Sequence, residues 1–83
     1  MSAHAEKAAD GAGVLSSVPE GRRVRVVALD AGRGMAARLA AMGVVPGVEL
    51  LVVNNRGAGP VVVEVKGTRL ALGRGMALKI LVR

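Results

Sequence analysis

The 83-residue sequence contains no cysteine, phenylalanine, tyrosine or tryptophan. The absence of cysteine excludes disulfides, thiolate metal sites and cysteine nucleophiles. The absence of aromatic residues removes the rings on which proteins stack the bases of single-stranded nucleic acid, a contact worth ~1–3 kcal/mol per base. Hydrophobic residues still make up 52% of the chain, so we expect a core built only from aliphatic side chains and methionine.

Long apolar runs are missing as well. No run approaches the ~20 residues that span a bilayer, and the amino terminus lacks the basic-then-apolar order of a secretory signal. We therefore expect a cytoplasmic protein that does not insert into a membrane. A length of 83 residues is enough for one domain at most.

Acidic residues are scarce, because 6 Asp and Glu stand against 12 Lys and Arg, and the formal net charge is +6. Such a balance favours nucleic acid, anionic lipid or an acidic protein surface as partner. The basic residues are spread along the chain, however, and form no tail or helical stripe. Solubility therefore explains the charge as well as an anionic partner does, and we expect no specific nucleic acid.

Catalytic groups do not come together in the sequence. The acids that follow the amino-terminal segment fall on separate expected elements, with no histidine or cysteine beside them: Glu20, Asp30, Glu49 and Glu64. No nucleophile–base pair and no acid/base dyad can be assembled from them. We expect neither enzymatic activity nor a cofactor.

The first 13 residues are small and polar and have no hydrophobic period, which is typical of a disordered tail. Residues 14–83 then form the expected domain. The only histidine, His4, lies in the tail. If Met1 is removed, the new amine, two backbone nitrogens and the His4 imidazole can bind Cu(II) or Ni(II) in square-planar geometry. This is the only metal site that the sequence indicates, and it does not suit Fe(II).

Short strands dominate the rest of the chain. Apolar alternation, β-branched residues and turn signals predict strands at residues 23–29, 48–53, 61–65, 69–72 and 78–82. A helix is expected over residues 35–42, with Asp30 as a candidate cap. Leu15 and Val18 are candidate core residues, and Gly67-Thr68 is an expected turn. The pattern indicates a mainly β fold, a small, partly open SH3-like barrel with one short helix after the first strand; an OB-fold usually needs a longer chain.

The corner after the helix is the most specific local feature. Gly43 stands where a helix ends in the left-handed conformation, and Pro46-Gly47 is a turn pair that directs the chain into the next strand. Upstream, residues 32–37 match the dinucleotide fingerprint G-x-G-x-x-A. A dinucleotide site also needs a parallel strand after the helix and further βα units, and too few residues remain for them.

These residues resemble the ferrous iron transport protein A (FeoA) family. The strongest motif is L-x-x-M-G-V-x-P-G from Leu39 to Gly47. Arg69-Leu70-Ala71-Leu72 and a closing Ile80-Leu81-Val82 follow in the family's order. The resemblance runs from Leu15 to Arg83 and leaves out the tail.

The resemblance implies a non-catalytic, cytosolic SH3-like protein of bacterial ferrous iron uptake. Its implied partner is the membrane-bound ferrous iron permease, which carries a cytosolic G-protein domain. Apart from the resemblance, the valine-rich strand edges leave homo-oligomers open. The candidate contact residues are Arg38, Gly43, Val44, Val45, Pro46 and Gly47. Two alternatives remain, a small basic nucleic-acid-binding barrel and an SH3-like regulatory domain related to iron-dependent repressors.

Overall fold

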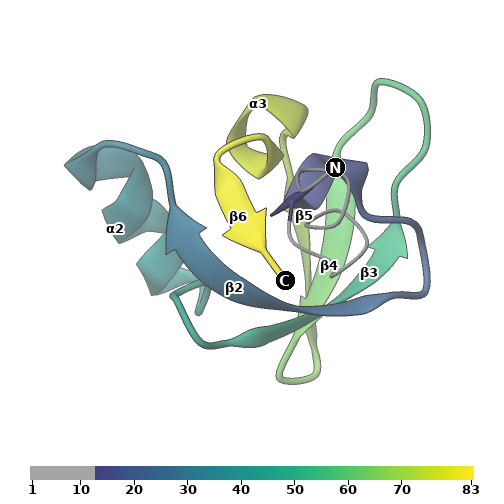
Figure 1. Ribbon diagram of the computed structural model, residues 1–83, viewed down its shortest axis with the longest axis horizontal. Helices are drawn as coiled ribbons and strands as arrows, with labels where there is room; N and C mark the ends of the chain where they lie inside the picture. The colour runs from purple at the N-terminus through teal and green to yellow at the C-terminus, as the bar shows by residue number, and fades with distance from the viewer. Residues whose placement is uncertain (1–12) are drawn as a thin grey trace, which may run out of the picture.

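The computed structural model describes residues 13–83, so His4 and the expected tail up to residue 12 lie outside the described residues. Six strands, one α-helix and two single-turn helices follow one another along the chain (Figure 1). In order they are β1 (Gly13–Val14), η1 (Leu15–Ser17), β2 (Arg23–Leu29), α2 (Arg33–Ala41), β3 (Glu49–Asn54), β4 (Val61–Val65), β5 (Thr68–Leu72), α3 (Arg74–Ala77) and β6 (Ile80–Val82).

The strands form one antiparallel sheet in the order β1-β6-β2-β3-β4-β5. The long strand β2 belongs to both halves of this sheet, because it pairs with β6 through its second part and with β3 through its first. A register shift between Val26 and Ala28 interrupts the pairing with β6. Such a bulge bends a strand and increases its twist, and β2 runs as a curved ribbon across the molecule (Figure 1). The sheet thereby folds over into the expected SH3-like, partly open barrel.

Alternation along the strands decides which side chains enter the core. Val61, Val63 and Val65 are buried on β4, whereas Val62 and Glu64 between them are partly exposed. This confirms the period-two assignment of that strand. The described residues have no buried polar side chain, so the interior consists of aliphatic groups alone.

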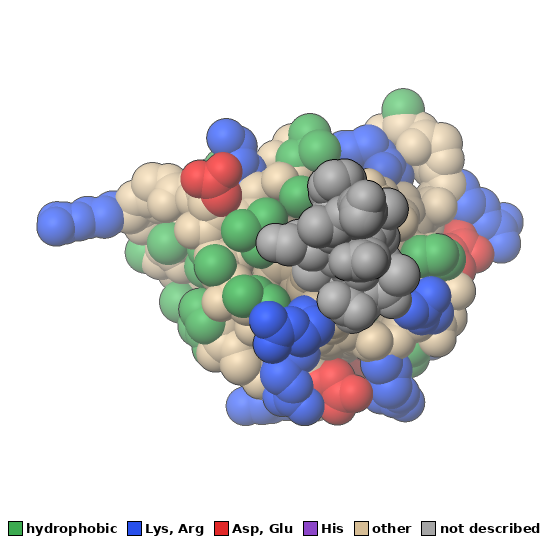
Figure 2. All heavy atoms as spheres, viewed as in Figure 1, with side chains coloured by type: hydrophobic (Ala, Val, Ile, Leu, Met, Phe, Trp, Pro, Cys, Tyr) green, Lys and Arg blue, Asp and Glu red, His purple; other side chains and the backbone are tan. Residues whose placement is uncertain are grey.

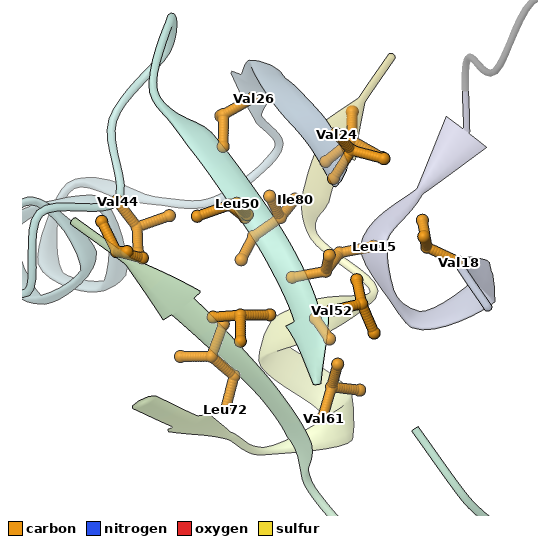
Figure 3. Packing of buried hydrophobic residues seen from close by; sticks show 14 of the residues in the cluster. Leu15, Val18, Val24, Val26, Val44, Leu50, Val52, Val61, Leu72 and Ile80 are labelled. Carbon is orange, nitrogen blue, oxygen red and sulfur yellow. The ribbon is translucent and has the colours of Figure 1, made fainter. Parts of the chain in front are cut away.

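The core lies between the two halves of the sheet. Leu15 and Val18, which come from η1 and the residue after it, pack beside Val52 of β3 (Figure 3). Leu50 and Ile80 meet deeper inside, and neither is exposed to solvent. The sequence-based expectation that Leu15 and Val18 anchor the start of the domain is therefore confirmed.

Several local expectations need correction, and the helix and the last strand begin at Arg33 and Ile80 rather than at residues 35 and 78. The turn between β4 and β5 is formed by Lys66 and Gly67, not by Gly67 and Thr68, because both have positive φ (50° and 85°) and Val65 pairs with Thr68. This is the two-residue hairpin geometry that matches strand twist. Asp30 does not cap α2: the cap is Gly32, without a side-chain hydrogen bond. Gly13 is already part of the sheet, paired with Val82.

Candidate functional site

The corner between α2 and β3 begins with a helix stop made by the backbone. Gly43 has φ +88°, a conformation that glycine adopts without the penalty of a Cβ atom. The Gly43 amide donates to the carbonyl of Ala40 (2.9 Å), and the Val44 amide donates to that of Leu39 (2.8 Å). This pair of bonds is the Schellman motif. Its usual apolar contact is supplied by Leu39 and Val44, which are both fully buried.

The second half of the corner is a tight turn. The Val48 amide donates to the Val45 carbonyl (3.1 Å), with Pro46 in between and Gly47 at φ +96°. Proline followed by a residue of positive φ is the signature of a type II turn. The Gly47 amide then donates to the carbonyl of Val26 (2.7 Å). The corner is thus fixed to β2 before β3 begins.

The corner exposes a small surface of defined shape. Val45 keeps 40% of its surface exposed, and Pro46 and Gly47 are exposed too. Val44, one of the predicted contact residues, points into the core and cannot contact a partner directly. The corner therefore presents a partly apolar tip, Val45, Pro46 and Gly47, with Val44 buried beneath it.

Two exposed arginines lie on elements that join the corner, Arg38 on α2 and Arg25 on β2. Arg38 is exposed in the last turn of α2, where a positive charge interacts favourably with the helix dipole. Neither ion pair among residues 13–83 involves it. Arg25, which sequence reasoning missed, donates through Nη1 to the Gly47 carbonyl (2.6 Å). No local signal links it to the corner, because 22 positions separate the two residues.

Elsewhere the positive charge is dispersed. In Figure 2, Lys and Arg side chains lie at several separate places on the visible face, with one group below the centre, while apolar side chains gather toward α2. The described side chains visible there form no continuous basic stripe of the kind that a nucleic-acid-binding surface carries.

A shallow hollow of about 370 Å³ lies on the outer face of β2, β3 and β4. It is lined by Arg23, Val48, Glu49, Leu51, Glu64, Lys66 and Gly67. Two cationic and two acidic residues in this lining give it a net charge of zero. The hollow therefore has no net preference for an anion or a cation.

No metal site forms within residues 13–83, where no group of three or more histidine or acidic side chains comes together. His4, the residue proposed from the sequence for Cu(II) or Ni(II), lies outside the described residues. Among the helices of the described part, none is long and apolar enough to cross a membrane.

A second cluster, which we call the loop anchor, consists of Glu20, Asn55 and Arg74. Asn55 Nδ2 donates to the carbonyls of Ser16 (2.9 Å) and Val18 (2.8 Å). Arg74 Nη2 donates to Asn55 Oδ1 (2.8 Å), and Arg74 Nε donates to the carbonyl of Gly59 (3.1 Å). One asparagine and one arginine thus join η1, the loop after β3, and α3.

Glu20 completes the loop anchor as an acceptor. Its Oε2 accepts from the backbone amide of Asn55 (2.8 Å) and from Arg56 Nε (3.0 Å). The Asn55 amide first, and the Arg56 side chain second, lower the pKa of Glu20 below its ordinary value of 4.5. Hydrogen bonds to a carboxylate favour its charged form. Sequence reasoning missed the whole cluster, because Asn55 lies 35 positions from Glu20 and 19 positions from Arg74.

Comparison with known proteins identifies the family that shares this sequence and fold. The family model for the FeoA domain matches residues 14–83. A curated protein of Methanocaldococcus jannaschii with the provisional name Fe(2+) transport protein A is 44% identical over 68 residues, which is 82% of each chain.

Solved structures share the fold. A crystal structure of an iron uptake regulatory protein (FeoA) has a TM-score of 0.83 and 32% identity, covering 87% of this chain and 96% of that one. FeoA of Stenotrophomonas maltophilia, described as an SH3 domain protein and crystallised with zinc, has a TM-score of 0.74 and 31% identity, covering 84% and 88%. A manganese-dependent transcriptional repressor has a TM-score of 0.78 and 27% identity, covering 86% of this chain but 40% of its own.

The family match, the 44% identical relative and the antiparallel SH3-like fold agree with one another. They also confirm the resemblance carried by the residues around the corner. The chain belongs to the FeoA family.

Proposed function

We propose that this protein is a non-catalytic, cytoplasmic accessory protein of ferrous iron transport that binds the permease at its cytosolic G-protein domain. The observation that carries the proposal is the corner. Its tip (Val45, Pro46 and Gly47) is exposed and partly apolar. The Gly47 amide bonds to Val26 of β2, and Gly43 and Val44, just before the tip, bond to α2. A rigid loop loses little conformational entropy on binding. A relative named as an Fe(2+) transport protein supports the link to ferrous iron transport, and the permease as partner follows from the family resemblance.

The charge of the corner defines the partner's surface. Arg25 donates to the Gly47 carbonyl, Arg38 is exposed on the helix that leads into the corner, and residues 38–48 include no acidic side chain. We therefore expect an acidic patch beside an apolar contact on the G-protein domain. Complementary charge raises the association rate and fixes orientation.

Calorimetric titration of the protein into the G-protein domain of the permease from the same organism tests the proposal. Arg38→Glu reverses the charge at the corner, and Arg33→Glu changes the net charge equally at the other end of α2. We expect Arg38→Glu to weaken binding at least tenfold and Arg33→Glu to change it by less than threefold, because screening limits distant charges.

Equal weakening by both variants would mean that net charge alone drives the contact, and would remove the corner from the proposal. No binding by the unmodified protein would reject the G-protein domain as partner. Retention on single-stranded nucleic acid at ~0.2 M salt would instead favour the nucleic-acid alternative, since phosphate contacts weaken steeply with salt.

A second candidate function is that of an SH3-like regulatory domain. The match to 40% of a manganese-dependent repressor favours it, because a domain of this fold also occurs within a larger regulator. A pull-down with the repressor's remaining domains, in the presence of Mn(II), distinguishes the two functions. Binding there, without binding to the G-protein domain, would make regulation the function.

A further inference from the structure

The two edges of the sheet differ in a way that points to self-association. β1 offers an edge of only two residues, whereas β5 offers five and, among the described strands, pairs with β4 alone. The pairing of β4 with β5 has no bulge, and β5 contains neither proline nor lysine; its one charged residue is Arg69. Natural edge strands are usually blunted by such features. β5 is therefore an edge that can accept another strand.

The register of the hairpin shows which backbone groups are free. Val65 and Thr68 flank a two-residue turn and form its hydrogen-bonded pair, and this character alternates along the ladder. Thr68, Leu70 and Leu72 thus bond to β4, while the amides and carbonyls of Arg69 and Ala71 face outward. Within residues 13–83, neither Arg69 nor Ala71 makes a backbone hydrogen bond to any other segment.

We propose that β5 pairs antiparallel with β5 of a second copy of this chain, about a two-fold axis at Leu70. In this register Arg69 of each copy lies opposite Ala71 of the other, and the two pairs form four backbone hydrogen bonds. An axis at Arg69 would instead place two guanidinium groups opposite each other, which is unfavourable. An axis at Ala71 would pair Arg69 with Gly73, outside the strand.

The side chains of β5 are also compatible with a two-fold axis at Leu70. Leu70 is only partly buried although it packs against the core, and the two-fold axis brings it against its own copy. The charge of Arg69 is balanced within its chain by Glu64, whose Oε1 lies 3.7 Å from Arg69 Nε. The strand can therefore form backbone hydrogen bonds with its own copy without placing like charges opposite each other. This makes a second copy a better occupant than a foreign strand.

Sedimentation equilibrium over a range of protein concentrations tests the pairing. Ala71→Arg places a new guanidinium opposite the partner's Arg69, whereas Ala71→Glu places a carboxylate there. Because the axis creates two such pairs, we expect the dimer constants of these variants to differ by about tenfold, with Ala71→Glu the tighter. Equal constants would overturn this register, and an unmodified chain that stays monomeric at millimolar concentration would overturn the pairing.

Two further measurements separate pairing from misfolding. Ala71→Pro removes only an outward-facing amide, which edge strands tolerate, so we expect a folded monomer. Amide exchange measured by NMR should slow with concentration at Arg69 and Ala71 but not at Leu70, which already bonds to β4. Slowing at all three, or at none, contradicts the proposed pairing. Self-association through β5 is independent of the permease contact, and either can fail alone.

Discussion

The two ends of β3 are fixed by different kinds of interaction. At its start, the corner is held by backbone hydrogen bonds around Gly43 and Gly47. At its end, the loop is held by the side chains of the loop anchor, above all Asn55 and Arg74. The first arrangement leaves the side chains at the tip free for a partner, whereas the second uses its side chains for stability. The comparison separates a candidate contact surface from a structural support.

The largest effect is expected from breaking the loop anchor. Asn55→Ala removes both donors to the carbonyls of Ser16 and Val18 and the acceptor of Arg74. At about 1 kcal/mol for each lost bond, and more for part-buried groups left unpaired, the loss should reach about 2–4 kcal/mol. Urea unfolding measures it. Asn54→Ala is the matched control, because the Asn54 side chain is exposed; equal losses would refute the role of Asn55.

A substitution in the corner should lower the free energy of unfolding by less than Asn55→Ala does. Gly43→Ala places a Cβ on a residue at φ +88°, where the nearest atom, Cγ1 of Val65, would lie at 3.6 Å. Space is sufficient, so only the backbone conformation is penalised, by about 1–2 kcal/mol. The melting temperature should fall accordingly. An unchanged stability would show that the Schellman geometry is not what holds the helix end.

A substitution within α2 is expected to increase the stability of the protein. Gly34 lies within α2, and a Cβ atom added there would meet no neighbouring atom within 4 Å. Gly34→Ala should therefore stabilise the protein by about 0.5–1 kcal/mol, since glycine is the poorer helix former. Paired unfolding curves of Gly34→Ala and Gly43→Ala check this. Two changes of the same sign would contradict the assignment of helix interior and helix end.

The smallest effect concerns pH. The folded-state pKa of Glu20 is lowered from 4.5, so the stability it contributes is present above about pH 4.5 and is lost as pH falls through the lower folded value. Glu20→Gln should flatten this part of the pH profile of unfolding. Glu49→Gln, on an exposed strand position, serves as the control. A profile unchanged by Glu20→Gln would show that the carboxylate does not hold the loop.

The difference between the two ends also explains what could be predicted from the sequence. The helix end at Gly43 and the turn at Pro46-Gly47 depend on residues that are close in the sequence, so a local sequence pattern is enough to predict them. The strands on either side alternate clearly enough to be recognised, as β4 does. Asn55 and Arg74 gave no such signal, because asparagine is common in loops and arginine is common in helices. Their contact, 2.8 Å between Arg74 Nη2 and Asn55 Oδ1, exists only in the folded chain.

Within the candidate site, the sequence predicted the backbone turns at Gly43 and at Pro46-Gly47. It did not predict which side chains are buried and which contacts come from other strands. Val44 lies at a predicted contact position but is buried, because the Schellman motif turns it toward Leu39. Arg25 was missed, since its contact with Gly47 crosses from another strand. Local patterns specify turns, whereas the choice between core and surface within a turn depends on long-range packing.

The most direct test follows amide shifts of the isotope-labelled protein during titration with the cytosolic G-protein domain of the permease. The account predicts shifts concentrated at residues 38–47, with residues 55–59 of the loop unchanged. Shifts centred on residues 55–59, or none at any concentration reached, would contradict the assignment of the corner as the contact surface.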